Sequence, residues 1–205
     1  MHEEILSQKQ RELLPILSYF SKQNFYLARG TALALQLGHR ESIDFDIFTF
    51  QEFNNLDIER ELSKLSNGKR ETIIDKLDEY TIIENAVKIT FLRYPFQIKD
   101  LLLINEIQLA NDLTIGAMKA YALGRRAKWK DYADLYVLLQ SYSLKNIIDK
   151  SKEIFGSLFS EKNFLQELAY FKDIDYTETI DWHIENPPTK EHIQQTLMEM
   201  SIQNL

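Results

Sequence analysis

The stretch from Arg29 to Phe48 places two carboxylates, Asp44 and Asp46, two residues apart and shortly after a Gly-Thr pair. On a β-strand, residues i and i+2 share one face and lie about 7 Å apart at the backbone, so their carboxylates can bind one cation. Hard cations such as Mg²⁺ prefer oxygen ligands, and a nucleotide supplies further oxygens from its phosphates. The pair therefore indicates a magnesium site suited to phosphoryl transfer.

Gly30 and Thr31 supply the complementary half of such a site. Glycine allows the backbone to approach a phosphate closely, and a helix that starts at Thr31 offers N–H groups at the positive end of its dipole. This order of turn, helix and strand is suited to a nucleoside triphosphate with its metal. Alternatively, Asp44 and Asp46 form the solvated face of an edge strand, and the Gly-Thr pair is a simple helix cap.

Hydrophobic periodicity predicts the elements that position these residues. Residues 42–48 alternate strictly between apolar and polar, which predicts a strand whose one buried face is formed by Ile43, Phe45 and Ile47. Gly38 is expected to end the preceding helix. The other predicted elements of this half are helices over 3–22, 31–37 and 55–66, and strands over 24–28, 71–75, 80–84 and 87–94.

Beyond a boundary near residues 105–112 the pattern becomes helical. Ser160 and Thr189 are predicted N-caps. We therefore expect an α/β fold with a mixed β-sheet flanked by helices over residues 1–110, and a helical C-terminal region over 111–205. The predicted helices of that region cover 112–124, 131–142, 144–155, 160–171 and 189–200.

Composition excludes several classes of function. The 205 residues include no cysteine, which excludes a disulfide scaffold, cysteine zinc sites and thiol catalysis. The N-terminus lacks the apolar core of a signal peptide, and no apolar stretch approaches the roughly 20 residues of a membrane span, so we expect a cytoplasmic protein without a membrane partner. The net charge of −7 argues against a dedicated nucleic-acid binder. Residues 125–130, RRAKWK, form a basic cluster that nonetheless favours a local polyanion contact.

Two motif blocks carry a family resemblance. FYLARGTALALQLGHRESIDFDIF, residues 25–48, resembles the first block of the AbiEii/AbiGii-type nucleotidyltransferase toxins, a branch of the polymerase-β-like nucleotidyltransferase superfamily. Residues 112–139 resemble that family's Lys…Ala…Arg…Lys-Asp-x-x-Asp-Leu-Tyr block, and residues 87–96 resemble the strand between the two. The resemblance implies a nucleotidyltransferase-like fold whose helical C-terminal region completes the active-site cleft.

The resemblance also implies an activity. It implies Mg²⁺-dependent transfer of a nucleoside monophosphate from an NTP to an acceptor hydroxyl, with RNA such as a tRNA end as acceptor. It further implies a toxin of an abortive-infection type toxin–antitoxin pair, with a cognate antitoxin as partner. On this sequence it assigns metal binding to Asp44 and Asp46, catalytic roles to these two together with Lys119 and Asp131, and substrate binding to Gly30, Thr31, Arg40, Arg126 and Lys130.

The residues of the second block also have simpler interpretations. Lys119 can extend from a packed helix face into water, and Asp131 can serve as a helix N-cap. The basic cluster can be a solvated face, and Trp129 is expected to pack against the protein rather than stack on a base.

Two departures from the family pattern leave alternatives open. The family usually has Gly-Gly-Thr, whereas this chain has Arg29 in place of the first glycine. Nucleotidyltransferases of this superfamily take a third carboxylate from a neighbouring strand, but residues 87–94 carry Lys88 and Thr90 on that face and no acid. Glu84 or Asp131 fills the role, or one metal suffices, or the chain is a catalytically silent nucleotide- or partner-binding module. A small-molecule nucleotidyltransferase of the antibiotic-modifying kind is a further alternative, which the negative net charge favours.

Overall fold

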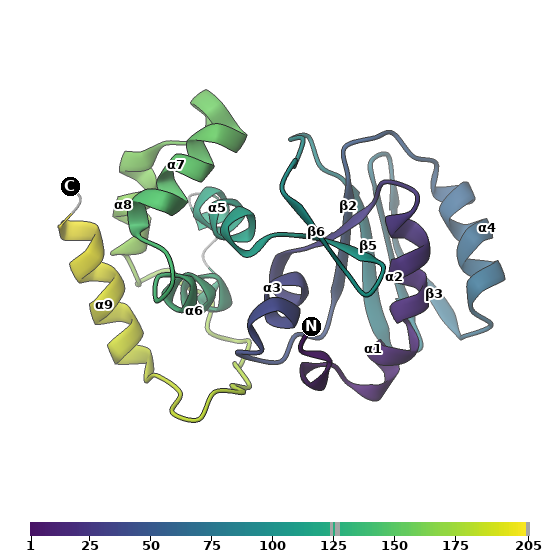
Figure 1. Cartoon of the computed structure of the whole chain (residues 1–205), viewed down its shortest axis with the longest axis horizontal. Coiled ribbons are helices and arrows are strands. Elements are labelled where there is room, and N and C mark those ends of the chain that lie inside the picture. The colour runs from purple at the N-terminus through teal and green to yellow at the C-terminus, as the bar shows by residue number, and fades with distance from the viewer. Residues whose placement is uncertain (124, 126–127, 204–205) are drawn as a thin grey trace. The chain divides into compact units, whose positions relative to one another are not determined.

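A computed structural model describes residues 1–123, 125 and 128–203 of the chain (Figure 1). The fold divides into two compact units, Met1–Asn111 and Asp112–Leu205. The first unit is a sheet with helices. Every element assigned in the described part of the second unit is a helix, with a long irregular segment between Leu168 and Lys190. Each unit is described separately below.

The N-terminal unit contains a mixed seven-stranded sheet in the order β3-β4-β5-β2-β1-β7-β6 (Figure 1). Strand β2 is central, and it pairs antiparallel with β1 and parallel with β5. Strand β1 also pairs parallel with β7, and the remaining neighbours are antiparallel. The strands are β1 (Tyr26–Ala28), β2 (Phe45–Thr49), β3 (Arg70–Lys76), β4 (Glu79–Glu84), β5 (Val87–Arg93), β6 (Leu101–Ile104) and β7 (Ile107–Ala110).

Helices pack on this sheet through aromatic and aliphatic side chains. Phe20 contacts Phe91 of β5 edge to face, with ring centroids 4.7 Å apart. Phe20 also contacts Phe25 edge to face, with ring centroids 5.6 Å apart. Both aromatic packing and the burial of apolar area hold the helices on the sheet. The helices of this unit are η1 (Glu3–Ile5), α1 (Gln8–Glu12), α2 (Leu14–Ser21), α3 (Arg29–Leu37) and α4 (Asn55–Leu65).

The predicted Asp-x-Asp strand is present but shorter than predicted, and it is buried on both faces over its second half. Ile43, expected in the core, is 66% exposed, because β2 begins only at Phe45. Phe45, Ile47 and Phe48 are all buried. A central strand has a neighbour on each side and can be covered on both faces, so the one-sided alternation holds only where the strand starts.

Three further features of the fold differ from the sequence prediction: the division of one helix, the start of another, and a hairpin. The helix predicted over 3–22 is divided into η1, α1 and α2, since Ser7 forms a capping box with Gln10 and starts a new helix. Helix α3 starts at Arg29 rather than Thr31, while Gly38 ends it at φ +64° as predicted. The hairpin of β6 and β7, with Asn105 and Glu106 at positive φ in its turn, was not predicted.

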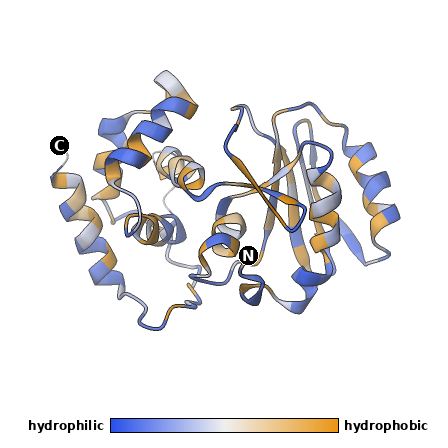
Figure 2. Ribbon diagram, viewed as in Figure 1, coloured by the Kyte–Doolittle hydropathy of each residue, from blue (hydrophilic) through white to orange (hydrophobic). Residues whose placement is uncertain are grey.

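The C-terminal unit is built around α5, whose residues are buried on most sides. It packs against α7 and α6, while α8 packs against α9. Figure 2 shows α5 mainly in pale and orange tones, whereas α9 alternates between hydrophilic and hydrophobic residues. This contrast is typical of a central helix and a surface helix. The helices are α5 (Asp112–Leu123), α6 (Trp129–Leu138), α7 (Leu144–Phe155), η2 (Gly156–Leu158), α8 (Glu161–Leu168) and α9 (Lys190–Ile202).

The ends of these helices follow local capping chemistry. Ser143 forms a capping box with Asn146, and Ser160 and Thr189 cap α8 and α9 as predicted. Asp131 is not an N-cap, because α6 begins at Trp129 and Asp131 lies within its first turn. None of the helices in the described part of the chain has the length and apolar character needed to span a bilayer.

Candidate active site

The two carboxylates lie where β2 begins. Asp46 is the second residue of the strand, and its backbone is opposite Ala28 of β1 on one side and Thr90 of β5 on the other. Asp44 comes just before the strand. The side chain of Asp44 is 42% exposed and that of Asp46 is 18% exposed, so both can be reached by a solute.

The pairing of β1 with β2 brings the start of α3 beside these carboxylates. The chain leaves β1 at Ala28, opposite Asp46, and enters α3 at the next residue. Its N-cap residue makes no side-chain hydrogen bond, and the first turn contains no acidic residue. The first N–H groups of a helix have no intrahelical partner and form the positive end of its dipole, so this end is suited to an anion.

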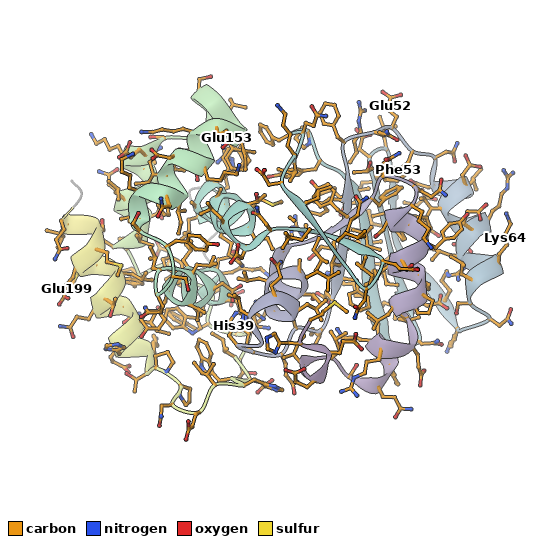
Figure 3. The ribbon with its side chains drawn as sticks, in the orientation of Figure 1. His39, Glu52, Phe53, Lys64, Glu153 and Glu199 are labelled. Atoms are coloured by element: carbon orange, nitrogen blue, oxygen red, sulfur yellow. The ribbon has the colours of Figure 1, made fainter. Side chains whose placement is uncertain are left out.

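A close approach of Arg40 leaves little room for a side chain at Gly30. A Cβ atom at Gly30 would lie 2.9 Å from Nη2 of Arg40 and 3.3 Å from Oγ of Ser42. Arg40 is buried, and its Nη1 donates a hydrogen bond of 2.8 Å to the carbonyl of Glu41. The guanidinium therefore packs against the start of α3, where it adds positive charge to the helix end. Figure 3 labels His39, the residue before Arg40 in this loop.

Thr31 positions the segment that leads into β2. Its hydroxyl donates to the main-chain carbonyl of Asp44 and lies 2.8 Å from the hydroxyl of Ser42. Thr31 is buried, so this hydroxyl is committed to the loop rather than directed to solvent. Its effect on a ligand would be indirect, through the placement of Asp44.

Each carboxylate has a basic side chain beside it. Nη1 of Arg29 lies 3.1 Å from Oδ1 of Asp46, and Nζ of Lys88 lies 3.7 Å from Oδ2 of Asp44. The guanidinium of Arg29 also lies over the ring of Phe48, at 4.9 Å from the centroid. Lys88 lies on the face of β5 where the family resemblance implies a third carboxylate. Because β5 is parallel to β2, this lysine lies beside Asp44.

The position opposite Asp46 on β5 is Thr90 and not an acid. Glu84, one sequence-based candidate for a third carboxylate, is fully buried and binds Nε of Arg70 at 2.7 Å and the hydroxyl of Ser66 at 2.5 Å. The carboxylate of Glu84 is therefore committed to Arg70 and Ser66. Among the residues described, no group of three or more His, Asp or Glu side chains is arranged to hold a metal ion.

The chemistry of the pair still fits a hard divalent cation as two of its ligands. Both carboxylates are accessible and offer the oxygen donors that such ions prefer. Magnesium at nucleotide sites commonly binds one or two carboxylates and takes its other ligands from phosphate and water. The basic side chains of Arg29 and Lys88 lie beside the same oxygens, so these side chains and a metal ion would compete for the two carboxylates.

The second motif block forms a buried ionic cluster on α5 and α6. Nζ of Lys119 lies 2.7 Å from Oδ1 of Asp131 and 2.6 Å from Oδ2 of Asp134. The side chains are 7%, 6% and 0% exposed, respectively. Asp131 and Asp134 share one helix face, as their spacing predicted, and Lys119 is the counter-ion of both.

The basic cluster is partly neutralised by an acid from a later segment. Lys128 and Lys130 bind the two oxygens of Glu178 at 2.7 and 3.1 Å. Their hydrogen bonds lower the pKa of the Glu178 carboxyl from 4.5 to about 2. The guanidinium of Arg125 lies over the ring of Tyr121, 3.6 Å from its centroid.

Two predictions for this cluster have different outcomes. Arg126, predicted to bind substrate, lies outside the described residues. Trp129 is 9% exposed and packs against Tyr132 and Tyr176, as expected for a packing tryptophan. Glu178 could not be found from the sequence, because it lies 50 residues from Lys128 and no local pattern connects them.

A hollow of about 330 Å³ lies at the other end of β2, beside Thr49 and Phe53. Figure 3 shows Glu52 and Phe53 at the opposite end of the sheet from His39. The hollow is lined by none of the residues predicted to bind nucleotide or metal.

Comparison with known proteins gives consistent results. A family model described as nucleotidyl transferase AbiEii toxin of a type IV toxin–antitoxin system matches residues 16–199. The uncharacterized protein aq_aa25 of Aquifex aeolicus (strain VF5) is 33% identical over 177 residues, which cover 82% of this chain and 84% of that protein.

Two solved structures share the fold. MenT4, a nucleotidyltransferase toxin of Mycobacterium tuberculosis H37Rv, aligns with a TM-score of 0.59 at 12% identity, over 96% of this chain and 82% of the other. JHP933 of Helicobacter pylori aligns with a TM-score of 0.54 at 16% identity, over 96% of this chain and 90% of the other. The mixed sheet with flanking helices is therefore a nucleotidyltransferase-like fold, as the sequence predicted.

Proposed function

The chain belongs to the AbiEii family of nucleotidyl transferase toxins of type IV toxin–antitoxin systems, and we propose that it transfers a nucleoside monophosphate from an NTP to a hydroxyl of RNA. The observation that carries the proposal is the convergence of Asp44 and Asp46 with the uncapped start of α3. This arrangement offers oxygen ligands for a metal beside a positive helix end for phosphate.

In this proposal, different residues of the N-terminal unit bind the triphosphate and the metal. The N–H groups at the start of α3, with the guanidinium group of Arg29 beside them, bind the triphosphate, and the buried guanidinium of Arg40 adds positive charge to this helix end. Gly30 leaves room for Arg40, and Thr31 fixes the segment that carries Asp44. Asp44 and Asp46 hold a divalent metal, Mg²⁺ in the proposal, which when bound neutralises charge on the phosphates. Catalysis then depends mainly on positioning and electrostatic stabilisation.

The acceptor is proposed from the basic cluster of the C-terminal unit. Arg125, Lys128 and Lys130 present positive charge suited to the phosphates of RNA, such as a tRNA end. Lys119 and Asp131 act in this proposal through the ends of α5 and α6, which their ion pair holds together. Membership of a toxin family supports a cognate antitoxin as protein partner, and an abortive-infection role is part of the proposal.

Incubation with each α-³²P-labelled NTP, Mg²⁺ and total RNA tests the proposal. We expect label on RNA with the wild type, and at least about a 10³-fold loss with the double variant Asp44→Asn/Asp46→Asn. The double variant Asp57→Asn/Asp75→Asn is the matched control, since it changes the charge of the same unit equally at exposed positions. Transfer that survives in the first variant, or label on a small molecule instead of RNA, would contradict the proposal.

A further inference from the structure

Arg29 has an unusual backbone conformation at the junction of β1 and α3. Its φ angle is +59°, in the left-handed region that glycine favours and most other residues avoid. An arginine at this position carries an energetic cost that a glycine would not. Backbone outliers of this kind cluster at ligand sites, so the function of the side chain is the next question.

The side chain of Arg29 is held from two sides. Its Nη1 lies 3.1 Å from Oδ1 of Asp46, and its guanidinium lies 4.9 Å from the ring centroid of Phe48, which is fully buried. Arginine is well suited to this combination of ion pair and cation–π contact. The side chain is 38% exposed, so the contact with Asp46 can be exchanged for another without opening the core.

This contact places a permanent cation on a proposed metal ligand. Two cations that share one carboxylate repel each other, so Arg29 lowers the affinity of Asp46 for a free divalent ion. A triphosphate at the start of α3 reverses the effect, because its oxygens offer the guanidinium a second anionic partner close by.

We infer that Arg29 is a positioning residue that couples metal binding to nucleotide binding. It holds Asp46 until a triphosphate is present, and it then binds phosphate and leaves Asp46 to the metal. The inference rests on the proposed function, because it assumes a triphosphate at α3. By thermodynamic linkage, nucleotide and metal then raise the affinity of the protein for each other by the same factor.

Binding of Mn²⁺ to the full chain, measured from the electron paramagnetic resonance signal of the free ion, tests this coupling. The titration is made with Mn²⁺ alone and with the α,β-methylene analogue of each of the four NTPs. Arg29→Gly removes the cation and suits the positive φ, whereas Arg29→Lys retains a charge. Arg93→Ala is the matched control, since Arg93 is 35% exposed and pairs with Glu52 and Asp78 in the same unit.

We expect the wild type to bind Mn²⁺ at least about tenfold more tightly with the analogue than without it. Arg29→Gly should bind Mn²⁺ alone about tenfold more tightly than the wild type. In this variant the analogue should then raise the affinity for Mn²⁺ by a correspondingly smaller factor. Arg29→Lys should retain part of the coupling, and Arg93→Ala should match the wild type. Thermal unfolding should show that Arg29→Gly is folded, because glycine accepts this backbone conformation.

Two other results would overturn the inference in distinguishable ways. Equal affinity of the wild type and Arg29→Gly for Mn²⁺ alone, with binding lost in Asp46→Asn, would reject the role of Arg29 and leave the metal site standing. Failure of both the wild type and Arg29→Gly to bind Mn²⁺ together with any analogue would reject the proposed function and the inference with it.

Discussion

Two clusters of charged side chains, one in each unit, differ sharply in their access to water. Asp44 and Asp46 of the N-terminal unit have side chains 42% and 18% exposed. Lys119, Asp131 and Asp134 of the C-terminal unit are 7%, 6% and 0% exposed, with nitrogen–oxygen distances of 2.6 and 2.7 Å. Both clusters combine carboxylates with basic side chains, but only the first leaves its carboxylates open to a solute.

The difference separates ligand binding from structural support. An exposed carboxylate can exchange a neighbouring cation for a metal at modest cost, because water screens both states. A buried carboxylate that loses its counter-ion becomes an uncompensated charge in a medium of low polarity. The first cluster is therefore suited to binding, and the second to holding α5 and α6 together.

Lys119→Met should have the largest effect on stability. It leaves Asp131 and Asp134 buried without their shared cation, and we expect a loss of about 3–5 kcal/mol in the free energy of unfolding. Urea unfolding measures this loss. Lys145→Met is the control, since the pair of Lys145 with Asp149 is exposed and should contribute about 0.5 kcal/mol or less. A loss below about 1 kcal/mol for Lys119→Met would remove the contrast between the clusters.

Thr31→Val should have an intermediate effect on the N-terminal unit. The change keeps the volume of a buried side chain but removes the hydroxyl that donates to the carbonyl of Asp44. We expect a loss of about 1–2 kcal/mol in unfolding free energy and weaker binding of Mn²⁺ with nucleotide, because Asp44 is less well fixed. Thr31→Ser keeps the hydroxyl and should retain metal binding. Unchanged stability and metal binding in Thr31→Val would show that the hydrogen bond does not position Asp44.

Glu178→Gln should raise the affinity for RNA a few-fold. Glu178 competes with phosphate for Lys128 and Lys130, and its neutralisation frees these lysines for the polyanion. Fluorescence anisotropy with a single-stranded RNA at several salt concentrations measures the effect, which should shrink as salt rises. Glu185→Gln removes the same charge from an exposed position nearby in sequence. An equal gain in Glu185→Gln would show that only net charge matters.

The smallest expected effect is on stability in acid. The pKa of Glu178 is lowered to about 2, so its ion pairs stabilise the fold fully above pH 4.5 and are lost as pH falls from 4.5 toward about 2. Because the side chain is 46% exposed, solvent screening keeps this contribution small. Unfolding free energies of the wild type and Glu178→Gln should differ slightly at about pH 5 and converge only as the pH approaches about 2. The same difference in unfolding free energy at both pH values would contradict the lowered pKa of Glu178.

The sequence predicted those parts of the fold that local patterns determine. The strand that carries Asp46 follows from alternation, and the end of α3 at Gly38 follows from the need for a left-handed residue. The hairpin of β6 and β7 was missed because its apolar residues do not alternate cleanly between buried and exposed. Leu102 and Leu103 are neighbours and both exposed, at 40% and 70%.

The pairings of charged residues could not be predicted, because they join residues distant in sequence. Arg29 meets Asp46 only because β1 and β2 are antiparallel neighbours, and Lys88 meets Asp44 only because β5 is parallel to β2. A periodic pattern identifies which face a residue lies on but not which strand lies beside it. The sequence therefore identified Arg29 as a departure from the family pattern, and only the fold showed its partner.

The most direct test of the carboxylate site is NMR line broadening by Mn²⁺ bound with a non-hydrolysable NTP analogue. Paramagnetic broadening falls steeply with distance, so it reports where on the chain the metal binds. We predict selective loss of the amide signals of Gly30, Thr31 and Phe45, which flank the carboxylates and the start of α3. Broadening confined to other parts of the chain, with these three signals unchanged, would contradict the assignment of Asp44 and Asp46 as the nucleotide–metal site.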